Sequence, residues 1–598
     1  MKRKLLFIAL GLACLISCKK EPVFIPKEIE KTDTTTVDPV DDPNSIAGVS
    51  ILEENNAVGM VTDASTGKGI AGVPVTDGYS WTRTDEKGVY QFKLDGRARL
   101  VYITVPADYE IPLDVNAHVP AFYAGGLDLH KRNRNDFSLQ PLGAPETEFS
   151  LIMLGDPQCQ NDSHLSRYTD ETMTDLRSYV SSYPRPYAVT LGDIVWNATG
   201  LWPKMRQAMS NVEVSGRYVP FFQCIGNHDH TATAALESKY DDTESLAFST
   251  ADREADYLST TDFVETFGPT DYSFDRGSAH IVVMDDVGCY GITRKKKLPD
   301  GYTCDYTGGL SDEQLAWLRE DLSMVPDKEN KLVVFCCHIP FRLSSGADGY
   351  KNFQNVLILL SEFHEAHIMD AHTHYSQNHI HTNYVCKGGK PIYEHVHGAA
   401  CGAFWQSNSS KTGSPNGYNV YRVCGNSIAS WICKGARRDE GYQMRIYDGN
   451  RPWGEESGLV NNYILRWYTV NNSVGTGPDT AKGYASFKDS FVAEVWDDDW
   501  ANWSLEFWQD GVKKGDFIRT PEKACCNIAI TSFYYNKIGL DSDAYCSKVG
   551  THYWYYKPSS GLPSSEKNWE VRATVTYPFS GEQRTFTCSR LTNDYSEY

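Results

Sequence analysis

Between residues 148 and 400, apolar runs typical of strands alternate with helix-like segments, and several runs end in a polar residue followed by a turn. The apolar runs are FSLIMLG, YAVTLG, VPFFQCIG, HIVVMDD, KLVVFCC and AHIMDA. Alternation of buried strands with helices is typical of α/β proteins. Polar residues after the strands of an open α/β sheet converge at one edge, where ligands bind. The pattern therefore predicts an α/β domain with a polar site at its strand ends.

One helix of this region is well marked. Ser311 can cap a helix in which Gln314 takes the third position, as in a capping box. Leu315, Leu318 and Leu322 then recur at helical spacing. We therefore expect an amphipathic helix that begins after Ser311.

The polar residues at the strand ends form five ordered blocks. The blocks are LGDPQ, LGDIVWN, IGNHD, CCHIP and DAHTHY. The ligand-type residues at the strand ends are carboxylates, amides and imidazoles with no thiolate among them, a set that suits a hydrolytic pair of Mn, Fe, Zn or similar ions better than a cysteine-based structural zinc site. Each of these residues alone is ordinary turn or cap chemistry. Five blocks in order favour a metal site.

In these blocks the chain resembles the calcineurin-like metallophosphoesterases, whose pattern is D-x-H, GD, GNH-D/E, a lone His and G-H-x-H. The resemblance covers roughly residues 148 to 400. The flanking regions are similar to the accessory N-terminal (transthyretin-like) and C-terminal β domains of a bacterial lipoprotein branch of that superfamily. The resemblance implies a central sandwich of stacked mixed sheets flanked by helices, and two divalent metal ions (Mn, Fe or Zn).

The resemblance also implies a set of seven metal ligands. Asp193 would bridge the two ions, because two cations about 3.5 to 4 Å apart need an anion between them. One ion would also take Asp156, Gln158 and His374, and the other Asn227, His338 and His372.

The implied reaction is attack of a metal-bridging hydroxide on phosphorus, in line with the leaving oxygen. His228 would act as general acid and donate a proton to the departing alkoxide. Asp229 would either orient the His228 imidazole or cap the following turn.

Three positions depart from the family pattern. Gln158 stands where His is usual, and an amide oxygen is a weaker donor than an imidazole, although some phosphatases of the superfamily also read GDPQ. Ala371 replaces the Gly before the H-x-H pair, which would strain the backbone only if that position needs a positive φ. Trp196 replaces an acidic or Tyr residue of some subfamilies.

Other polar and aromatic residues have two interpretations each. Six histidines near the motifs either touch substrate or, more ordinarily, are solvated or structural: His164, His230, His379, His381, His395 and His397. Arg342 either holds a phosphate oxygen or lies at the surface. The run WDDDWANWSLEFW either stacks on sugars or packs between sheets. The insertion HTATAALESKYDDTESLAFSTADREADY after the GNHD block is expected to overlie the site.

Composition shifts divide the 598-residue chain into five segments. Short β-branched runs between turns before the central region predict a small antiparallel sandwich, and aromatic and β-branched runs after it predict a β-rich domain. The expected segments are a signal peptide at 1–17, a disordered tether at 18–47, a β-sandwich at 48–145, the metallophosphoesterase domain at 146–415 and a β-rich domain at 416–598.

The N-terminus combines a basic stretch, a short apolar run and then Cys18. This is a secretory signal, too short to span a membrane as a mature helix. The string Leu15-Ile16-Ser17-Cys18 resembles a bacterial lipobox, which implies lipid on Cys18 and a cell-envelope lipoprotein at the outer membrane, on its periplasmic or surface face. An ordinary cleaved signal is the alternative. In an exported compartment, Cys289 and Cys304 are either a local disulfide or two thiols.

The sequence thus predicts an exported, lipid-anchored phosphoesterase acting on mono- or diesters, with a small-molecule, lipid or sugar phosphate as substrate. The net charge of −20 and the lack of a basic patch argue against nucleic acid, and so against a nuclease. The alternative is a lipid-anchored binding protein on a degenerate metallophosphoesterase scaffold, with Gln158 as the mark of decay. Oligomeric state is open.

Overall fold

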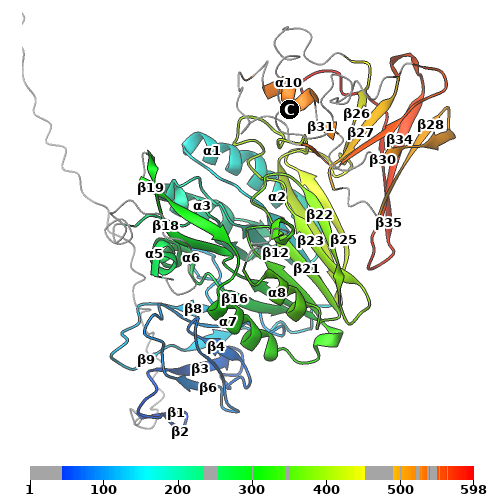
Figure 1. Ribbon diagram of the computed structural model, residues 1–598. Helices are drawn as coiled ribbons and strands as arrows, with labels where there is room; N and C mark the ends of the chain where they lie inside the picture. Colours follow the sequence, from blue (N-terminus) through cyan, green and yellow to red (C-terminus); the bar gives the residue numbers. More distant parts are fainter. Residues whose placement is uncertain are drawn as a thin grey trace, which may run out of the picture.

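The computed structural model describes residues 44–233, 254–298, 301–344, 351–451, 489–497, 502–519, 525–526, 528–534, 538, 549–550, 552–561 and 563–598. The expected signal, Cys18, the expected tether as far as residue 43, and residues 234–253 of the insertion lie outside these ranges. Among the described residues, no helix is both long and apolar enough to cross a membrane. Figure 1 shows a β domain at one end of the molecule, a large central α/β domain and a second β domain at the other end.

The N-terminal domain is built from two small sheets around a shared core, below the central domain in Figure 1. One sheet has the order β10-β3-β6, with β9 also paired to β3. Its strands are β3 (Ala57–Asp63), β6 (Val89–Phe92), β9 (Asn133–Arg134) and β10 (Phe137–Leu139). The other sheet, β5-β4-β7-β8, consists of β4 (Pro74–Thr76), β5 (Trp81–Arg83), β7 (Val101–Ile103) and β8 (Tyr123–Ala124). The expected sandwich is not purely antiparallel, since β3 runs parallel to β9 and β10.

The first sheet of the central domain has the order β15-β12-β11-β24-β25. The strands are β11 (Glu148–Leu154), β12 (Pro186–Leu191), β15 (Phe221–Cys224), β24 (Gly417–Cys424) and β25 (Ser427–Gly435). The first three are parallel, and β24 and β25 continue the sheet antiparallel. The central sheet therefore runs past residue 415, the boundary expected from the sequence. The reason is that an aromatic, β-branched hairpin has the same pattern whether it extends an α/β sheet or begins a β domain.

The second central sheet has the order β16-β17-β20-β21-β23-β22. The strands are β16 (Tyr272–Arg276), β17 (Ala279–Val283), β20 (Leu332–Cys336), β21 (Glu365–Asp370), β22 (Gln377–Val385) and β23 (Pro391–Val396). The four inner strands are parallel and the two outer ones antiparallel. Strands β17, β20 and β21 are buried along their whole length, as expected for strands covered on both faces.

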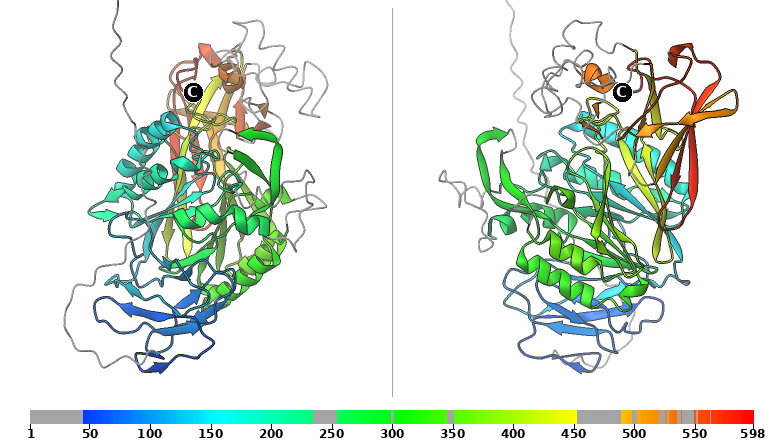
Figure 2. Two further views of the ribbon diagram at one scale, coloured as in Figure 1. Left: turned by 90° about the vertical axis from the view of Figure 1, so that its left-hand side faces the viewer. Right: turned by 45° about the vertical axis from the view of Figure 1, so that its right-hand side comes forward.

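Helices cover the outer faces of both sheets, as the two views of Figure 2 show. On one side lie α1 (Asp162–Arg167), α2 (Thr174–Tyr179) and α3 (Trp202–Ser210), and on the other α7 (Asp312–Ser323) and α8 (Phe353–Leu360). The predicted capping box is confirmed: the Ser311 side chain accepts from the Gln314 amide, and the Gln314 side chain accepts from the Ser311 amide. The expected α/β sandwich of stacked mixed sheets is the observed fold.

Two further elements lie beside the central sheets, on the left-hand side of Figure 1. A long hairpin follows β17 and is formed by β18 (Val287–Leu298) and β19 (Gly301–Gly308). Beside it are the short helices α5 (Glu254–Ser259) and α6 (Thr261–Phe267). Cys289 and Cys304 lie in this hairpin as two buried thiols in hydrogen-bond contact.

The C-terminal domain contains two four-stranded sheets. The first, β26-β27-β33-β30, consists of β26 (Met444–Asp448), β27 (Phe491–Val495), β30 (Ile518–Arg519) and β33 (Tyr553–Tyr556). The second, β29-β28-β34-β35, consists of β28 (Trp503–Gln509), β29 (Val512–Asp516), β34 (Trp569–Thr576) and β35 (Gln583–Cys588). Trp496, Trp503 and Phe507 of the aromatic run are buried, whereas Trp508 is half-buried beneath the Arg572 guanidinium, so among the described residues only the inward-facing side chains of this run pack in the core.

The N-terminal domain is joined to the outermost strand of the second central sheet. The carbonyl of Val105, just after β7, accepts a hydrogen bond from the Asp275 amide of β16 at 2.9 Å. Arg276, fully buried, donates to the carbonyl of Pro106 at 2.8 Å and faces the Glu146 carboxylate. A buried guanidinium that holds both sides of an interface fixes the two domains together.

Candidate metal centre

The predicted metal ligands follow the carboxyl ends of strands from both central sheets. Asp156, Asp193 and Asn227 come directly after β11, β12 and β15, and His338 and His372 after β20 and β21. The two sheets place these strand ends against each other. Five of the ligands have left-handed backbone, with φ between 39° and 64°: Asp156, Gln158, Asp193, His372 and His374. Non-glycine residues adopt this conformation at a cost, and such strain gathers at functional sites.

Two groups of side chains in this region could each hold a metal ion, and they share one carboxylate. Asp193, His338 and His372 form one group, and Asp156, Asp193 and His374 form the other. Within each group the ligand atoms lie within 4.8 Å of one another. The structure therefore places Asp193 between the two halves of the site, the position that the resemblance implies for a bridging residue.

His338 has a fixed tautomer that directs a lone pair into the site. Its Nδ1–H donates to the Leu191 carbonyl at 2.8 Å. Its Nε2 faces Asn227 Oδ1 at 3.0 Å, His372 Nδ1 at 3.1 Å and Asp193 Oδ1 at 3.4 Å. With this tautomer, the lone pair of His338 Nε2 faces the oxygen atoms of Asn227 and Asp193, which are acceptors as well. Such a cluster needs a positive charge at its centre.

The other half of the site contains buried polar atoms without a hydrogen-bond partner in the described part of the chain. They are both carboxylate oxygens of Asp156, Oε1 of Gln158 and Nδ1 of His374. Unpartnered buried oxygens are costly, and metal coordination is one way to satisfy them. His374 Nε2 lies 3.4 Å from Asp156 Oδ1. These residues fit a divalent ion by the chemistry of their donor atoms.

The pKa shifts of the side chains in this cluster agree with a metal-binding role. Burial lowers the pKa of His372 to about 3 and that of His374 well below its usual value, so both imidazoles are neutral and keep a lone pair. Burial alone would raise the pKa of Asp193, but the imidazoles of His338 and His228 hold it below its ordinary range. His372, His374 and Asp193 are therefore in the forms that bind metals. Burial alone would lower the pKa of His338, but Asp193 raises it to about 10, so an ion would replace the proton of His338.

Two of the departures from the family pattern are accommodated. Gln158 donates from Nε2 to Asp193 Oδ2 at 2.6 Å, and its Oε1 remains for an ion. The side chain thus lies in the cluster in the way a ligand would. Ala371 does not have a positive φ; the left-handed residues nearby are His372 and His374. Its methyl group therefore strains nothing.

The predicted general acid lies beside the metal centre. The backbone N–H of His228 donates to Asp193 Oδ1 at 2.8 Å, which fixes the residue against the shared carboxylate. Its ring stacks on Trp196 with centroids 4.4 Å apart, and its Nδ1 pairs with Asn197 Oδ1 at 3.2 Å. Burial lowers the pKa of His228, which makes its protonated form a stronger acid. Trp196 thus supports the imidazole at the position where other subfamilies use a different residue.

Asp229 does not orient His228. Its carboxylate accepts from the amides of Gly226 at 3.0 Å, Ile194 at 3.1 Å and Val195 at 3.4 Å. It therefore ties the loop that carries Asp193 to the loop that carries Asn227. Neither of the two roles weighed from sequence is the one observed, because the donors belong to Gly226, which precedes Asp229, and to the Asp193 loop, not to the following turn. A carboxylate that accepts three backbone donors has no need of the neighbouring ring.

Sequence reasoning missed two residues of the site. Asn197, which pairs with His228, carries no motif signal beyond its place in LGDIVWN. Asp286 accepts from the amides of His338 and Ile339 at 3.0 and 3.1 Å and so positions the His338 loop. The sequence did indicate Asp286: it is the last residue of the run HIVVMDD and follows the apolar part of a strand, as the ligands do.

The remaining candidates have other hydrogen-bond partners. His395 is buried and bonded to His367 at 2.9 Å, and His397 pairs with the Tyr421 hydroxyl at 2.9 Å. His381 pairs with Glu394 at 2.7 Å, and Arg342, half-buried, donates to the Tyr375 hydroxyl at 2.9 Å. His164 accepts from the Gln160 amide next to α1. These contacts give each of them a structural partner.

Family comparisons follow the same division of the chain. Residues 55–142 match the model described as the N terminal of Calcineurin-like phosphoesterase, residues 149–376 the model described as Calcineurin-like phosphoesterase, and residues 394–578 the model described as the C terminal of Calcineurin-like phosphoesterase. No curated protein matches the sequence. The middle match contains every predicted metal ligand.

Proposed function

Because the chain belongs to the calcineurin-like phosphoesterases, we propose that it is an exported, lipid-anchored enzyme that hydrolyses phosphate mono- or diesters with two divalent ions. One observation carries the proposal: two metal-binding groups of side chains share the Asp193 carboxylate. The Asp/His composition favours Mn, Fe or Zn. Bound ions would supply Lewis acidity, which stabilises charge on a phosphoryl group and makes a water acidic enough to act as nucleophile at neutral pH.

The residues of the chain then have separate tasks. Asp193 and the neutral histidines hold the cations, and Asp156 and Gln158 add buried oxygen donors on one side. Asp229 and Asp286 hold the ligand-bearing loops through backbone amides, so the donors are in place before substrate arrives. Preorganised ligands of this kind need little rearrangement during the reaction.

His228 is the proposed general acid. Its ring is fixed on one face by Trp196 and at Nδ1 by Asn197, which leaves Nε2 to donate a proton to the departing alkoxide. The contribution of such a donor depends on the leaving group. A poor leaving group, such as an alkoxide, needs the proton, whereas p-nitrophenolate leaves without it.

The substrate class is a small-molecule, lipid or sugar phosphate ester. The strongly negative chain is a poor partner for nucleic acid. Lipid on Cys18 would hold the enzyme at the outer membrane through the tether. Mass spectrometry of the mature N-terminus tests this part: a diacylglyceryl group on Cys18 is expected, and Cys18→Ala should release the protein from membranes.

The main test combines metal content with turnover. We expect close to two ions per chain at this centre and hydrolysis of p-nitrophenyl phosphate or its bis ester, with both lost in Asp193→Asn. The preferred ester distinguishes a phosphatase from a phosphodiesterase. No metal and no turnover of either ester with added Mn²⁺, Fe²⁺ or Zn²⁺ would instead favour a lipid-anchored binding protein on the same scaffold.

A further inference from the structure

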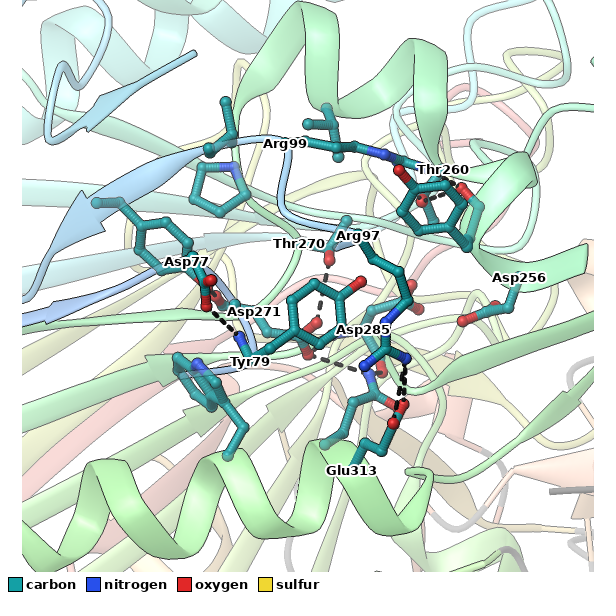
Figure 3. Close-up of a pocket in the computed structure, with 18 of the residues that line it drawn as sticks. Asp77, Tyr79, Arg97, Arg99, Asp256, Thr260, Thr270, Asp271, Asp285 and Glu313 are labelled. Atoms are coloured by element: carbon teal, nitrogen blue, oxygen red, sulfur yellow. Dashed lines mark hydrogen bonds and ion pairs between the residues drawn. The ribbon is translucent and has the colours of Figure 1, made fainter. Parts of the chain in front are cut away.

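A pocket of about 420 Å³ lies between the N-terminal and central domains, away from the metal centre. Figure 3 shows its two walls: Arg97, from the N-terminal domain, reaches across to Glu313, while Asp256 and Asp285 lie on the side of the central domain. Carboxylates outnumber arginines among the side chains that line it. The pocket therefore favours a cation over an anion.

Asp256 and Asp285, which line this pocket, could hold a metal ion together with the buried His230. His230 follows the GNHD block, Asp256 belongs to α5 and Asp285 follows β17. Their ligand atoms lie within 4.8 Å of one another, and the three residues are 2, 8 and 3% exposed. Residues 230, 256 and 285 form no sequence motif, because they come from three separate segments. We refer to these three side chains as the interdomain triad.

The hydrogen bonds of His230 leave Nε2 directed at a carboxylate. The Ser259 hydroxyl lies 2.8 Å from the Asp256 carbonyl and 2.8 Å from Nδ1 of His230. When the hydroxyl donates to the carbonyl, it accepts from Nδ1–H of His230. The Nε2 atom then presents its lone pair to Asp285 Oδ1 at 3.3 Å. In this arrangement two acceptor atoms face each other, as they do around His338, and a positive charge between them stabilises the contact.

That charge is either a proton or a metal ion, and a second histidine of this chain shows what the proton case looks like. His280 pairs through Nδ1 with Asp275 at 2.7 Å and through Nε2 with Asp321 at 2.9 Å. These are the short distances of charge-assisted hydrogen bonds. The 3.3 Å contact of His230 is longer, and it falls within the separation of about 3.0 to 3.5 Å that two ligands about 2.1 Å from one ion would have.

The charge of the triad also favours a divalent metal ion. With a neutral imidazole its two carboxylates carry two negative charges in a buried position, and a divalent ion neutralises both, whereas a proton on His230 neutralises one. Burial lowers the pKa of His230, but Asp285 and Asp256 more than compensate and raise it to about 9. At neutral pH this negative field holds a proton on the imidazole when no ion is bound, and a metal ion would replace that proton.

We propose that His230, Asp256 and Asp285 bind a divalent transition-metal ion, separate from the metal centre. One imidazole and two carboxylates suit Mn²⁺ or Zn²⁺. The pocket supplies an entry path and room for water on the remaining coordination positions. The ion would connect the loop after His228, helix α5 and the end of β17, so its role is to hold these segments together beside the catalytic loop.

The experiment counts Mn²⁺ ions bound to the full chain after equilibrium dialysis. We expect three ions in wild type, two in Asp285→Asn, and three in the matched control Glu313→Gln, which removes a carboxylate of the same pocket outside the triad. Asp193→Asn should lose the ions of the metal centre and keep one. That remaining ion should disappear in Asp193→Asn combined with Asp285→Asn.

Two outcomes would overturn the proposal. An equal count in wild type and Asp285→Asn means that the triad is a protonated imidazole between carboxylates. Loss of the third ion in Glu313→Gln as well means that Mn²⁺ is attracted by the pocket as a whole. The outcome is independent of the proposed function: if only one ion binds and Asp285→Asn removes it, the interdomain site stands and the binuclear centre fails. If Asp285→Asn does not fold, the Mn²⁺ count of Asp193→Asn and the paramagnetic broadening of the His230 ring signals in that variant decide.

Discussion

The metal centre and the interdomain triad both bring buried carboxylates and imidazoles together, but they differ in backbone conformation and in hydrogen bonding. Around Asp193, most ligands sit on left-handed backbone at strand ends, and several buried donor atoms have no partner in the described part of the chain. In the triad, none of the three residues has a positive φ, and His230, Asp256 and Asp285 each have a hydrogen-bond partner. Backbone strain therefore distinguishes the two sites. It is present at the metal centre, where we propose that the substrate binds, and absent from the triad, for which we propose only a role in connecting segments.

The largest expected effect tests the first half of this comparison. Asp193→Asn removes the carboxylate shared by both metal groups, so kcat/KM should fall by at least about 10³-fold. Steady-state hydrolysis of p-nitrophenyl phosphate at saturating Mn²⁺ measures this. Retention of more than a tenth of the activity would show that the two groups do not act as one centre.

The next effect concerns His228. In His228→Gln the ring is lost but the backbone bond to Asp193 can remain, so the loss reports proton donation. We expect kcat to fall by about 10² to 10⁴-fold for an alkyl phosphate and much less for p-nitrophenyl phosphate. An equal loss for both esters would assign His228 to substrate binding or to metal positioning.

Asn197 should give a smaller effect because it acts through His228. Asn197→Leu removes the oxygen that pairs with Nδ1, and we expect a loss of about tenfold in kcat for the alkyl ester with KM unchanged. Asn197→Asp keeps an oxygen at this position and should retain most of the activity. If both variants lose activity equally, the residue is needed for the loop rather than for the ring.

The triad is expected to influence stability more than rate. Asp256→Asn should change kcat/KM by less than about threefold, since the residue touches neither group of the metal centre. Wild type should gain thermal stability from Mn²⁺ through the bound third ion, and the variant should lose that part of the gain. Thermal unfolding with and without Mn²⁺, in the Asp193→Asn background, measures it. An identical shift in both proteins would remove the distinction drawn between the two sites.

The smallest effect on activity, and a clear one on stability, is expected at His280. Burial alone would lower its pKa, but Asp321 and Asp275 raise it to about 10, above the ordinary value of 6.5. The stabilisation is therefore complete below pH 6.5 and is lost as the pH rises towards 10. Urea unfolding of wild type between pH 6.5 and 10 should show this loss, and His280→Gln should show a smaller one, because the raised pKa of His230 contributes to the same pH dependence. A wild-type stability that stays constant over this range would mean that the imidazole is neutral.

Much of the central domain could be predicted from local pattern. Apolar runs such as KLVVFCC become fully buried strands because no other element of that length can bury every side chain. Ser311 and Gln314 start α7 because their capping contacts lie within one turn of chain. The polar residues after the strands meet because parallel strands bring their carboxyl ends to one edge. These predictions depend only on short-range chemistry.

What sequence could not supply depends on pairing between distant segments. His230 and Asp285 are 55 residues apart, and no motif relates them. The hairpin β24–β25 pairs with β11 across more than 260 residues, so its membership of the central sheet is a matter of register and not of composition. Asp229 was ambiguous for a similar reason: its neighbour in sequence is His228, but its partners in space include the amides of Ile194 and Val195.

The bond between Val105 and Asp275 has a consequence for the exposed edge of the second central sheet. Strand β16 is the last of its sheet, and a bare sheet edge offers amides and carbonyls to any other extended chain, which is a route to aggregation. Val105 occupies part of that edge, and Arg276 holds the covering segment in place. The accessory domain therefore shields the catalytic sheet from its own copies, and a chain that lacks residues 48–145 should precipitate through exposed β16 even if its catalytic residues fold correctly.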